Sequence, residues 1–144
     1  MDLSECERKE FIKKAKPSIS LIKSLIEVSK AKETALKSAN IDKITVNAYI
    51  PMAYDALREI LEALCVLHGY KVTNHVCLGE LLRKLEPDFD YNSFDRFRYI
   101  RNSINYYGKA IGLIEGKDVI NKMLQMRKNN LIKLESKIKQ DKND

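Results

Sequence analysis

The chain has 144 residues, of which 44% are hydrophobic and 32% are charged, and its formal net charge at pH 7 is +6. This length and balance are typical of one globular domain that can bury a core without disulfides or metal. No apolar run approaches the roughly 20 residues that a membrane-spanning helix needs, so we expect no membrane segment. The basic balance favours an acidic partner without identifying one.

The first residues carry acids and bases before any apolar stretch, which is not the arrangement of a secretion signal. The chain has three cysteines, an odd number. Without an export signal, an odd cysteine count indicates free thiols in a reducing compartment. We therefore predict a cytoplasmic protein.

Only five glycines and three prolines interrupt the chain, which favours long helices with few connections. Ser4 followed by Glu7 predicts a capped helix start. Pro17 interrupts the apolar pattern that follows, so either one helix kinks there or a short first helix ends and a second begins with Pro17 in its first turn. We predict the second arrangement. Asn40 is a suitable residue to end that second helix.

A helix over 42–67 is predicted next, with Asp42 as its cap. Pro51 lies inside this range, so we expect either a kink near Ala48 or a late start. Gly69 supplies the left-handed residue that ends the helix.

Thr73 or Asn74 opens a shorter helix that Pro87 stops. A helix over 92–108 follows, and then a loop rich in glycine. The last helix is predicted over 117–139, and we expect residues 137–144 to form a frayed tail.

No stretch of the sequence favours a strand over a helix, because the one β-leaning run, 72–78, is short and flanked by helix signals. We find no internal repeat and no break in composition. The sequence therefore predicts an all-α fold in one domain, 1–144: an antiparallel up-and-down bundle of four long helices plus one or two short helices.

The helix over 92–108 has a polar stripe beside its apolar face. The apolar face is made of Phe97, Ile100, Ile104 and Tyr107. The polar stripe, which we call the Arg/Asn stripe, is made of Arg98, Arg101, Asn102 and Asn105. Its fixed hydrogen-bond donors, with no carboxylate among them, suit a phosphate-bearing partner. The alternative is that these are ordinary solvated positions beside a core face.

Two tyrosines, Tyr99 and Tyr106, project near the Arg101 side of the same helix. Their rings could stack on nucleic-acid bases, although tyrosines in helical bundles also straddle core and surface. We include Tyr99 with the Arg/Asn stripe as a candidate binding residue.

The segment 101–107, RNSINYY, resembles the motif of the HEPN superfamily. In that motif four to six residues separate an Arg, which is usually followed by a polar residue, from a His. Residues 56–64, with the following Gly69-Tyr70-Lys71 and His75, resemble the second helix and turn of prokaryotic HEPN proteins. Arg101 and Asn102 match the motif, whereas Tyr106 stands where the shortest spacing would place the histidine.

The resemblance implies a homodimer in which two such helices face each other and build one composite cleft. Many HEPN proteins are metal-independent ribonucleases, toxins in particular, often paired with a minimal nucleotidyltransferase as antitoxin. In such a cleft Arg101 would stabilise the phosphorane, Asn102 would orient the phosphate and Tyr106 would donate a proton or hydrogen bond. A phenol with a pKa of about 10 is a poor base near neutrality, where an imidazole titrates.

The only histidines are His68 and His75, and the sequence does not place either beside Arg101. With Cys65 and Cys77 they offer four zinc-ligand types within a short span, but their spacing matches no zinc module. We therefore predict no metal and no other cofactor.

Three functions remain open at this point. The leading hypothesis is a HEPN-like homodimeric module that binds RNA, a nucleotide or a partner protein through the Arg/Asn stripe, with degenerate or absent nuclease activity. The alternative is a metal-independent endoribonuclease of the toxin–antitoxin type, in which Tyr106 or a histidine from elsewhere replaces the motif histidine. The third is a helical adaptor whose stripe makes only interhelical hydrogen bonds.

Overall fold

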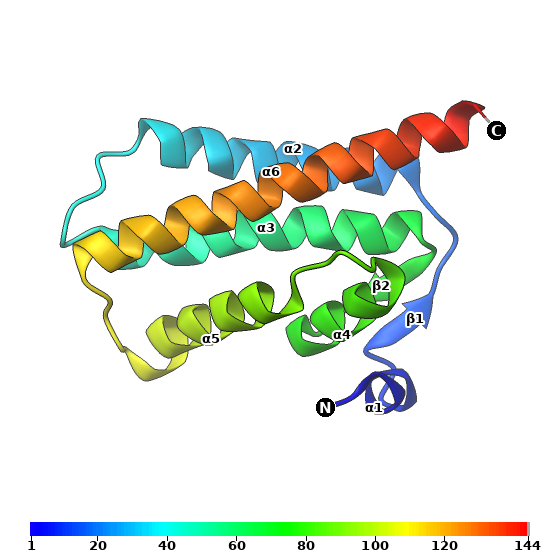
Figure 1. Cartoon of the computed structure of the whole chain (residues 1–144), viewed down its shortest axis with the longest axis horizontal. Coiled ribbons are helices and arrows are strands. Elements are labelled where there is room, and N and C mark those ends of the chain that lie inside the picture. The colour runs from blue at the N-terminus through cyan, green and yellow to red at the C-terminus, as the bar shows by residue number, and fades with distance from the viewer. Residues whose placement is uncertain (144) are drawn as a thin grey trace.

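The computed structural model describes residues 1–143, and Figure 1 shows them as a bundle of helices with a small sheet at one end. The helices are α1 (Leu3–Arg8), α2 (Ile19–Ser38), α3 (Val46–Leu67), α4 (His75–Leu85), α5 (Tyr91–Tyr107) and α6 (Leu113–Asn143), and the strands are β1 (Ile12–Lys14) and β2 (Tyr70–Val72). The long helices α2, α3, α5 and α6 run in alternating directions along the chain (Figure 1). This confirms the predicted all-α bundle of four long helices, here with the two short helices α1 and α4.

α3 is the central helix of the bundle. α2 and α6 cover one side of it, and α4 and α5 lie on the other side (Figure 1). Side chains around most of the circumference of α3 are buried, among them Ile50, Tyr54, Leu57 and Leu64. A helix with so broad an apolar surface is stable only where other helices cover it, which explains its place in the middle.

α3 begins later than its predicted cap. It starts at Val46, and the Asp42 carboxylate instead accepts hydrogen bonds from the backbone N–H groups of Ile44 and Thr45 in the preceding turn. α3 thus starts late, which was one of the two expectations raised by Pro51, and Pro51 still lies inside the helix. Gly69 has a φ of +88°, as the predicted left-handed end of this helix requires.

The predicted boundaries of the first two helices need correction. Asp2, not Ser4, caps α1, and its side chain accepts a hydrogen bond from the backbone N–H of Glu5. α2 starts at Ile19 with Ser18 as its cap, so Pro17 lies just before the helix. The division into a short helix and a long one is as predicted.

The prediction that no strand forms is wrong for two three-residue segments. β1 and β2 pair antiparallel, with Ile12 opposite Val72 and Lys14 opposite Tyr70. Segments of three residues are too short to show a periodicity, and their partners lie far apart in the chain. The pairing closes the end of the bundle at which α3 finishes (Figure 1).

The prediction of free thiols is wrong for two of the three cysteines. Cys6 and Cys77 form a disulfide with a Cα–Cα distance of 5.7 Å, across a sequence separation of 71 residues. Cys65 is a buried free thiol. The disulfide fastens the N-terminal segment to the first turn of α4, and the β1–β2 pair fastens it to residues 70–72.

α6 begins at Leu113 and continues to Asn143, so it is longer at both ends than the predicted 117–139. Gly116, predicted in a loop, lies within the helix and close to Val46 and Ile50 of α3. A Cβ atom on Gly116 would lie 2.5 Å from Cγ2 of Val46. The segment 137–144, predicted as a frayed tail, is helical to Asn143, and residue 144 lies outside the described residues.

A buried polar cluster joins α2, α3 and α6. The Arg127 guanidinium pairs with Glu33 at 2.7 Å and donates to the Ser29 hydroxyl at 2.6 Å. That hydroxyl donates in turn to the backbone carbonyl of Ala56 at 2.6 Å. Arg127 is almost wholly buried, so these partners offset the free-energy cost of removing its charge from water.

Within the described residues, no helix has the length and apolar character needed to cross a membrane.

Candidate functional site

A pocket of about 260 Å³ lies between α5 and the start of α4. We call it the Arg101 pocket. Its lining residues are Thr73, Asn74, His75, Val76, Arg98, Arg101, Asn102 and Tyr106. Four of these were predicted as site residues, and the other four come from the segment that opens α4.

α5 is held in place by its buried face and by both of its ends. Phe94, Phe97 and Ile100 are buried. Asp90 caps the start by accepting a hydrogen bond from the backbone N–H of Ser93, and Gly108 ends the helix with a φ of +62°. The predicted apolar face extends less far than expected, because Tyr107 is 75% exposed. The polar side of α5 is therefore carried on a firmly anchored helix.

The hydrogen-bond partners of the Arg101 guanidinium are neutral groups. Its Nη1 donates to the Asn102 side-chain oxygen and to the Tyr106 hydroxyl, both at 3.1 Å. Its Nε is buried and has no hydrogen-bond partner among the described residues. No carboxylate in the described part of the chain forms an ion pair with it. A half-buried cation without a carboxylate partner is available to an anion, although its Nε is enclosed by the protein.

Arg98, one turn earlier on α5, differs from Arg101 in having a carboxylate partner. Its Nη2 donates to Asp95 at 2.8 Å, and Asp95 is partly exposed. The Asp95 carboxylate offsets much of the Arg98 charge. Arg101 is therefore the main positive group of the pocket.

His75, the first residue of α4, brings an imidazole into the Arg101 pocket. Its Nδ1 lies 3.2 Å from the hydroxyl oxygen of Tyr54, which is a hydrogen-bond distance. Burial, and then the positive charges of Arg58 and Arg101, lower the pKa of His75 from 6.5 to about 4. The ring is therefore neutral at pH 7.

The pocket gathers some of the predicted site residues and leaves out others. Arg98, Arg101, Asn102 and Tyr106 line it together. Tyr99 and Asn105 are exposed on α5 but do not line the pocket.

His75 was not among the predicted site residues, but helix lengths contain a signal that could have found it. α4 has 11 residues, and a short connection leads into α5. Arg101 is the eleventh residue of α5, so an antiparallel return along α4 brings this part of α5 near the start of α4. The two helices are offset, since the Tyr91 hydroxyl donates to Glu80 at 2.9 Å, more than one turn before the end of α4.

The four potential zinc ligands do not converge. Cys77 is in the disulfide, and Cys65 is buried in the core. Nε2 of His68 lies 3.0 Å from the Glu86 carboxylate, and His75 contacts Tyr54. Within residues 1–143, no three His, Cys, Asp or Glu side chains are grouped so that they could hold a metal ion.

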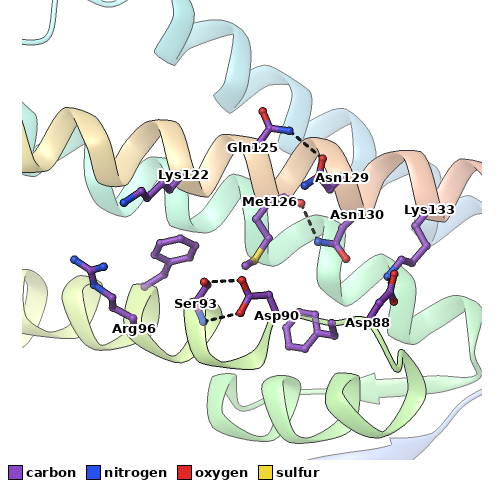
Figure 2. Close-up of a pocket in the computed structure, with 12 residues that line it drawn as sticks. Asp88, Asp90, Ser93, Arg96, Lys122, Gln125, Met126, Asn129, Asn130 and Lys133 are labelled. Carbon is purple, nitrogen blue, oxygen red and sulfur yellow. Dashed lines mark hydrogen bonds and ion pairs between the residues drawn. The ribbon is translucent and has the colours of Figure 1, made fainter.

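A larger pocket, of about 540 Å³, lies between α5 and α6 (Figure 2). Its polar groups mostly satisfy one another. Asp88 accepts a hydrogen bond from Lys133 at 2.7 Å, and this contact lowers the pKa of Asp88. Asp90 accepts from the Ser93 hydroxyl at 2.7 Å. The carboxylates of Asp88 and Asp90 make this pocket less suited to an anion than the Arg101 pocket, whose lining has no acidic side chain.

Comparison of the chain with protein-family models, with curated proteins and with solved structures gave no match. The functional argument therefore rests on the geometry of the Arg101 pocket and on the sequence motif.

Proposed function

We propose that this protein is a HEPN-like helical module that binds a phosphate group of single-stranded RNA in the Arg101 pocket, without cleaving it. The observation that carries the proposal is that Arg101 is a half-buried guanidinium whose hydrogen-bond partners are neutral and which has no carboxylate partner among the described residues. A desolvated charge of this kind gains most when an anion with several acceptor oxygens comes beside it.

Exposed aromatic rings near the pocket support an RNA ligand. Tyr99 and Tyr106 are 65% and 67% exposed. They lie seven residues apart on α5 and so on nearly the same face, about 10 Å apart along the helix axis. Unstacked bases on either side of a bound phosphate can stack on such rings.

The resemblance of residues 101–107 to the HEPN motif gives further support and implies a homodimer. The exposed edge of α5, with Tyr99, Tyr106 and Tyr107, is available for contact with a second copy. The resemblance also implies a minimal nucleotidyltransferase as a partner and a place in the cytoplasm. A disulfide such as Cys6–Cys77 is uncommon in that compartment.

The experiment is a binding titration of a fluorescently labelled single-stranded RNA at several salt concentrations, with Arg101→Gln beside the wild type. We expect the variant to bind about tenfold more weakly and to lower the slope of log affinity against log salt by about one. The control is Arg96→Gln, which removes the same charge from an exposed position on α5 outside the Arg101 pocket. Equal losses in both variants, or no binding by the wild type, would contradict the proposal.

One observation favours a second candidate function, a metal-independent ribonuclease. His75 lies in the same pocket as Arg101, in a chain that has Tyr106 at the motif position. Incubation of the protein with RNA in EDTA tests this function. Cleavage by the wild type and by Arg96→Gln, but not by Arg101→Gln or His75→Gln, would establish it. If the wild type leaves the RNA intact, the binding function alone stands.

A further inference from the structure

We infer that Tyr54 is a positioning residue that fixes the tautomer of His75, so that His75 presents a hydrogen-bond donor, and no base, to the ligand of the Arg101 pocket. The role of His75 toward an RNA ligand rests on the proposed function. The effect of Tyr54 on the His75 tautomer does not depend on any ligand.

Tyr54 is wholly enclosed. It projects from α3, with no solvent exposure. Its ring stacks on Phe94, with 5.8 Å between centroids, and lies 5.6 Å from the His75 ring. The Arg101 guanidinium lies 5.7 Å from its centroid. These contacts leave the hydroxyl group one hydrogen-bond partner within the described residues, Nδ1 of His75 at 3.2 Å.

The proton of the Tyr54 hydroxyl decides the tautomer. Burial raises the pKa of Tyr54, so the group keeps its proton at neutral pH. A buried O–H that finds no acceptor costs free energy, and the acceptor within reach is Nδ1 of His75. Nδ1 must then carry no proton, and a neutral imidazole carries its proton on Nε2. In the opposite tautomer the Tyr54 hydroxyl proton would have no partner.

The charges around His75 oppose a second ring proton. Arg58 from α3 and Arg98 and Arg101 from α5 disfavour the imidazolium, and Asp55 from α3 favours it only in part. A proton added to Nδ1 would also meet the hydroxyl proton of Tyr54. His75 therefore stays neutral, with Nδ1 occupied by Tyr54.

The ring nitrogen left for a ligand is Nε2. It makes no hydrogen bond to any of the described residues, and the ring lines the pocket. In the tautomer argued above, Nε2 is a donor. The pocket then offers an anion N–H groups from Arg98, Arg101 and His75, and its imidazole has no free lone pair to accept a proton from a ribose hydroxyl.

The direct test is a nitrogen-15 NMR spectrum of the histidine rings in the ligand-free protein at pH 7. The chain has two histidines, so a His68→Gln variant leaves the signals of His75 alone. We expect the shifts of an unprotonated Nδ1 and a protonated Nε2. A protonated Nδ1, or a rapid mixture of both tautomers, would overturn the inference.

A pair of tyrosine variants tests the role of the hydroxyl group. Tyr54→Phe should convert the His75 spectrum from one tautomer to a mixture. Tyr49→Phe, on the same helix and not in contact with the pocket, should leave it unchanged. If Tyr54→Phe also leaves the tautomer unchanged, Tyr54 does not position the ring.

Two substitutions of His75 distinguish two roles of its ring: Nε2 as a hydrogen-bond donor to the ligand, and Nδ1 as the acceptor for the Tyr54 hydroxyl. Gln places an amide N–H near the position of Nε2, whereas Asn places a carbonyl near the position of Nδ1. With the labelled RNA as probe, we expect His75→Asn to weaken binding about tenfold and His75→Gln to weaken it much less. The reverse order would overturn the inference. A wild type with the expected tautomer that does not bind RNA would instead refute the proposed function and leave the role of Tyr54 standing.

Discussion

Arg98 and Arg101 lie one helical turn apart on α5, yet only Arg98 has a carboxylate beside it. The Asp95–Arg98 pair has the spacing of neighbours on a helix surface and can be read from the sequence. The surroundings of Arg101 cannot, since they include Tyr54 from α3 and His75 from α4. The sequence could therefore predict which residues form the Arg/Asn stripe, but not which of the two charges lacks a partner.

The lowered pKa of His75 predicts a pH dependence of stability. In the unfolded chain His75 has its ordinary pKa of 6.5, and in the folded protein its pKa is about 4. Between these values the unfolded state binds more protons, so the free energy of unfolding decreases as the pH falls from 6.5 to 4. Well above pH 6.5 the group is neutral in both states and contributes nothing to the dependence.

The measurement is urea denaturation of the wild type and of His75→Asn at pH 7 and pH 4.5. Allowing for the partial solvent exposure of the ring, we expect the wild type to lose about 2 kcal/mol more than the variant over this interval. Other groups that titrate in this range affect both proteins alike. Equal losses would mean that His75 is not shielded in the folded state.

At the scale of elements, the six helices illustrate what a sequence pattern can and cannot predict. The long helices follow from apolar side chains that repeat over several turns, and the start of α4 follows from the side chain of Asn74, which accepts hydrogen bonds from Val76 and Cys77. β1 and β2 were missed because each is stabilised by the other, not by its own residues. The start of α6 was missed because Gly116 was taken as a loop residue, whereas its small size serves the contact with α3.

The close approach of α6 to α3 predicts that a methyl group at position 116 is harmful. The Cβ of Gly116→Ala would collide with Val46, which is fully buried and has a stiff branched side chain. We expect the substitution to lower the free energy of unfolding by about 1–3 kcal/mol, although alanine is the better helix former.

Gly112→Ala is the matched control, since its Cβ would meet nothing within 4 Å. It should leave the free energy of unfolding nearly unchanged. In the double variant Gly116→Ala/Val46→Ala the collision is absent, so the effects of the two substitutions should not add. Additive effects in denaturation measurements would show that Gly116 and Val46 are not in contact.

For the molecule as a whole, the Cys6–Cys77 disulfide is the longest covalent constraint on the described chain. It links residues 71 positions apart, and closing a loop of this length restricts the unfolded chain. We expect the double substitution Cys6→Ser/Cys77→Ser to lower the free energy of unfolding by about 4 kcal/mol, a value that depends on the loop-entropy model.

The disulfide itself is checked by counting thiols in denaturant without a reductant. The wild type should give one thiol per chain, that of Cys65, and three after reduction. Reductant should destabilise the wild type and leave the double variant unaffected. Three thiols in the protein as isolated would instead agree with the free cysteines that the sequence predicts.

The central position of α3 has a consequence for how the protein is made. A ribosome releases α3 well before α6, and the two helices cover each other's apolar side chains. At a synthesis rate of about 5–20 residues per second, the interval between the ends of α3 and α6 is on the order of 4–15 seconds. During that time the side of α3 that α6 covers stays exposed, so we expect chaperones to bind the growing chain until the last turns of α6 have emerged.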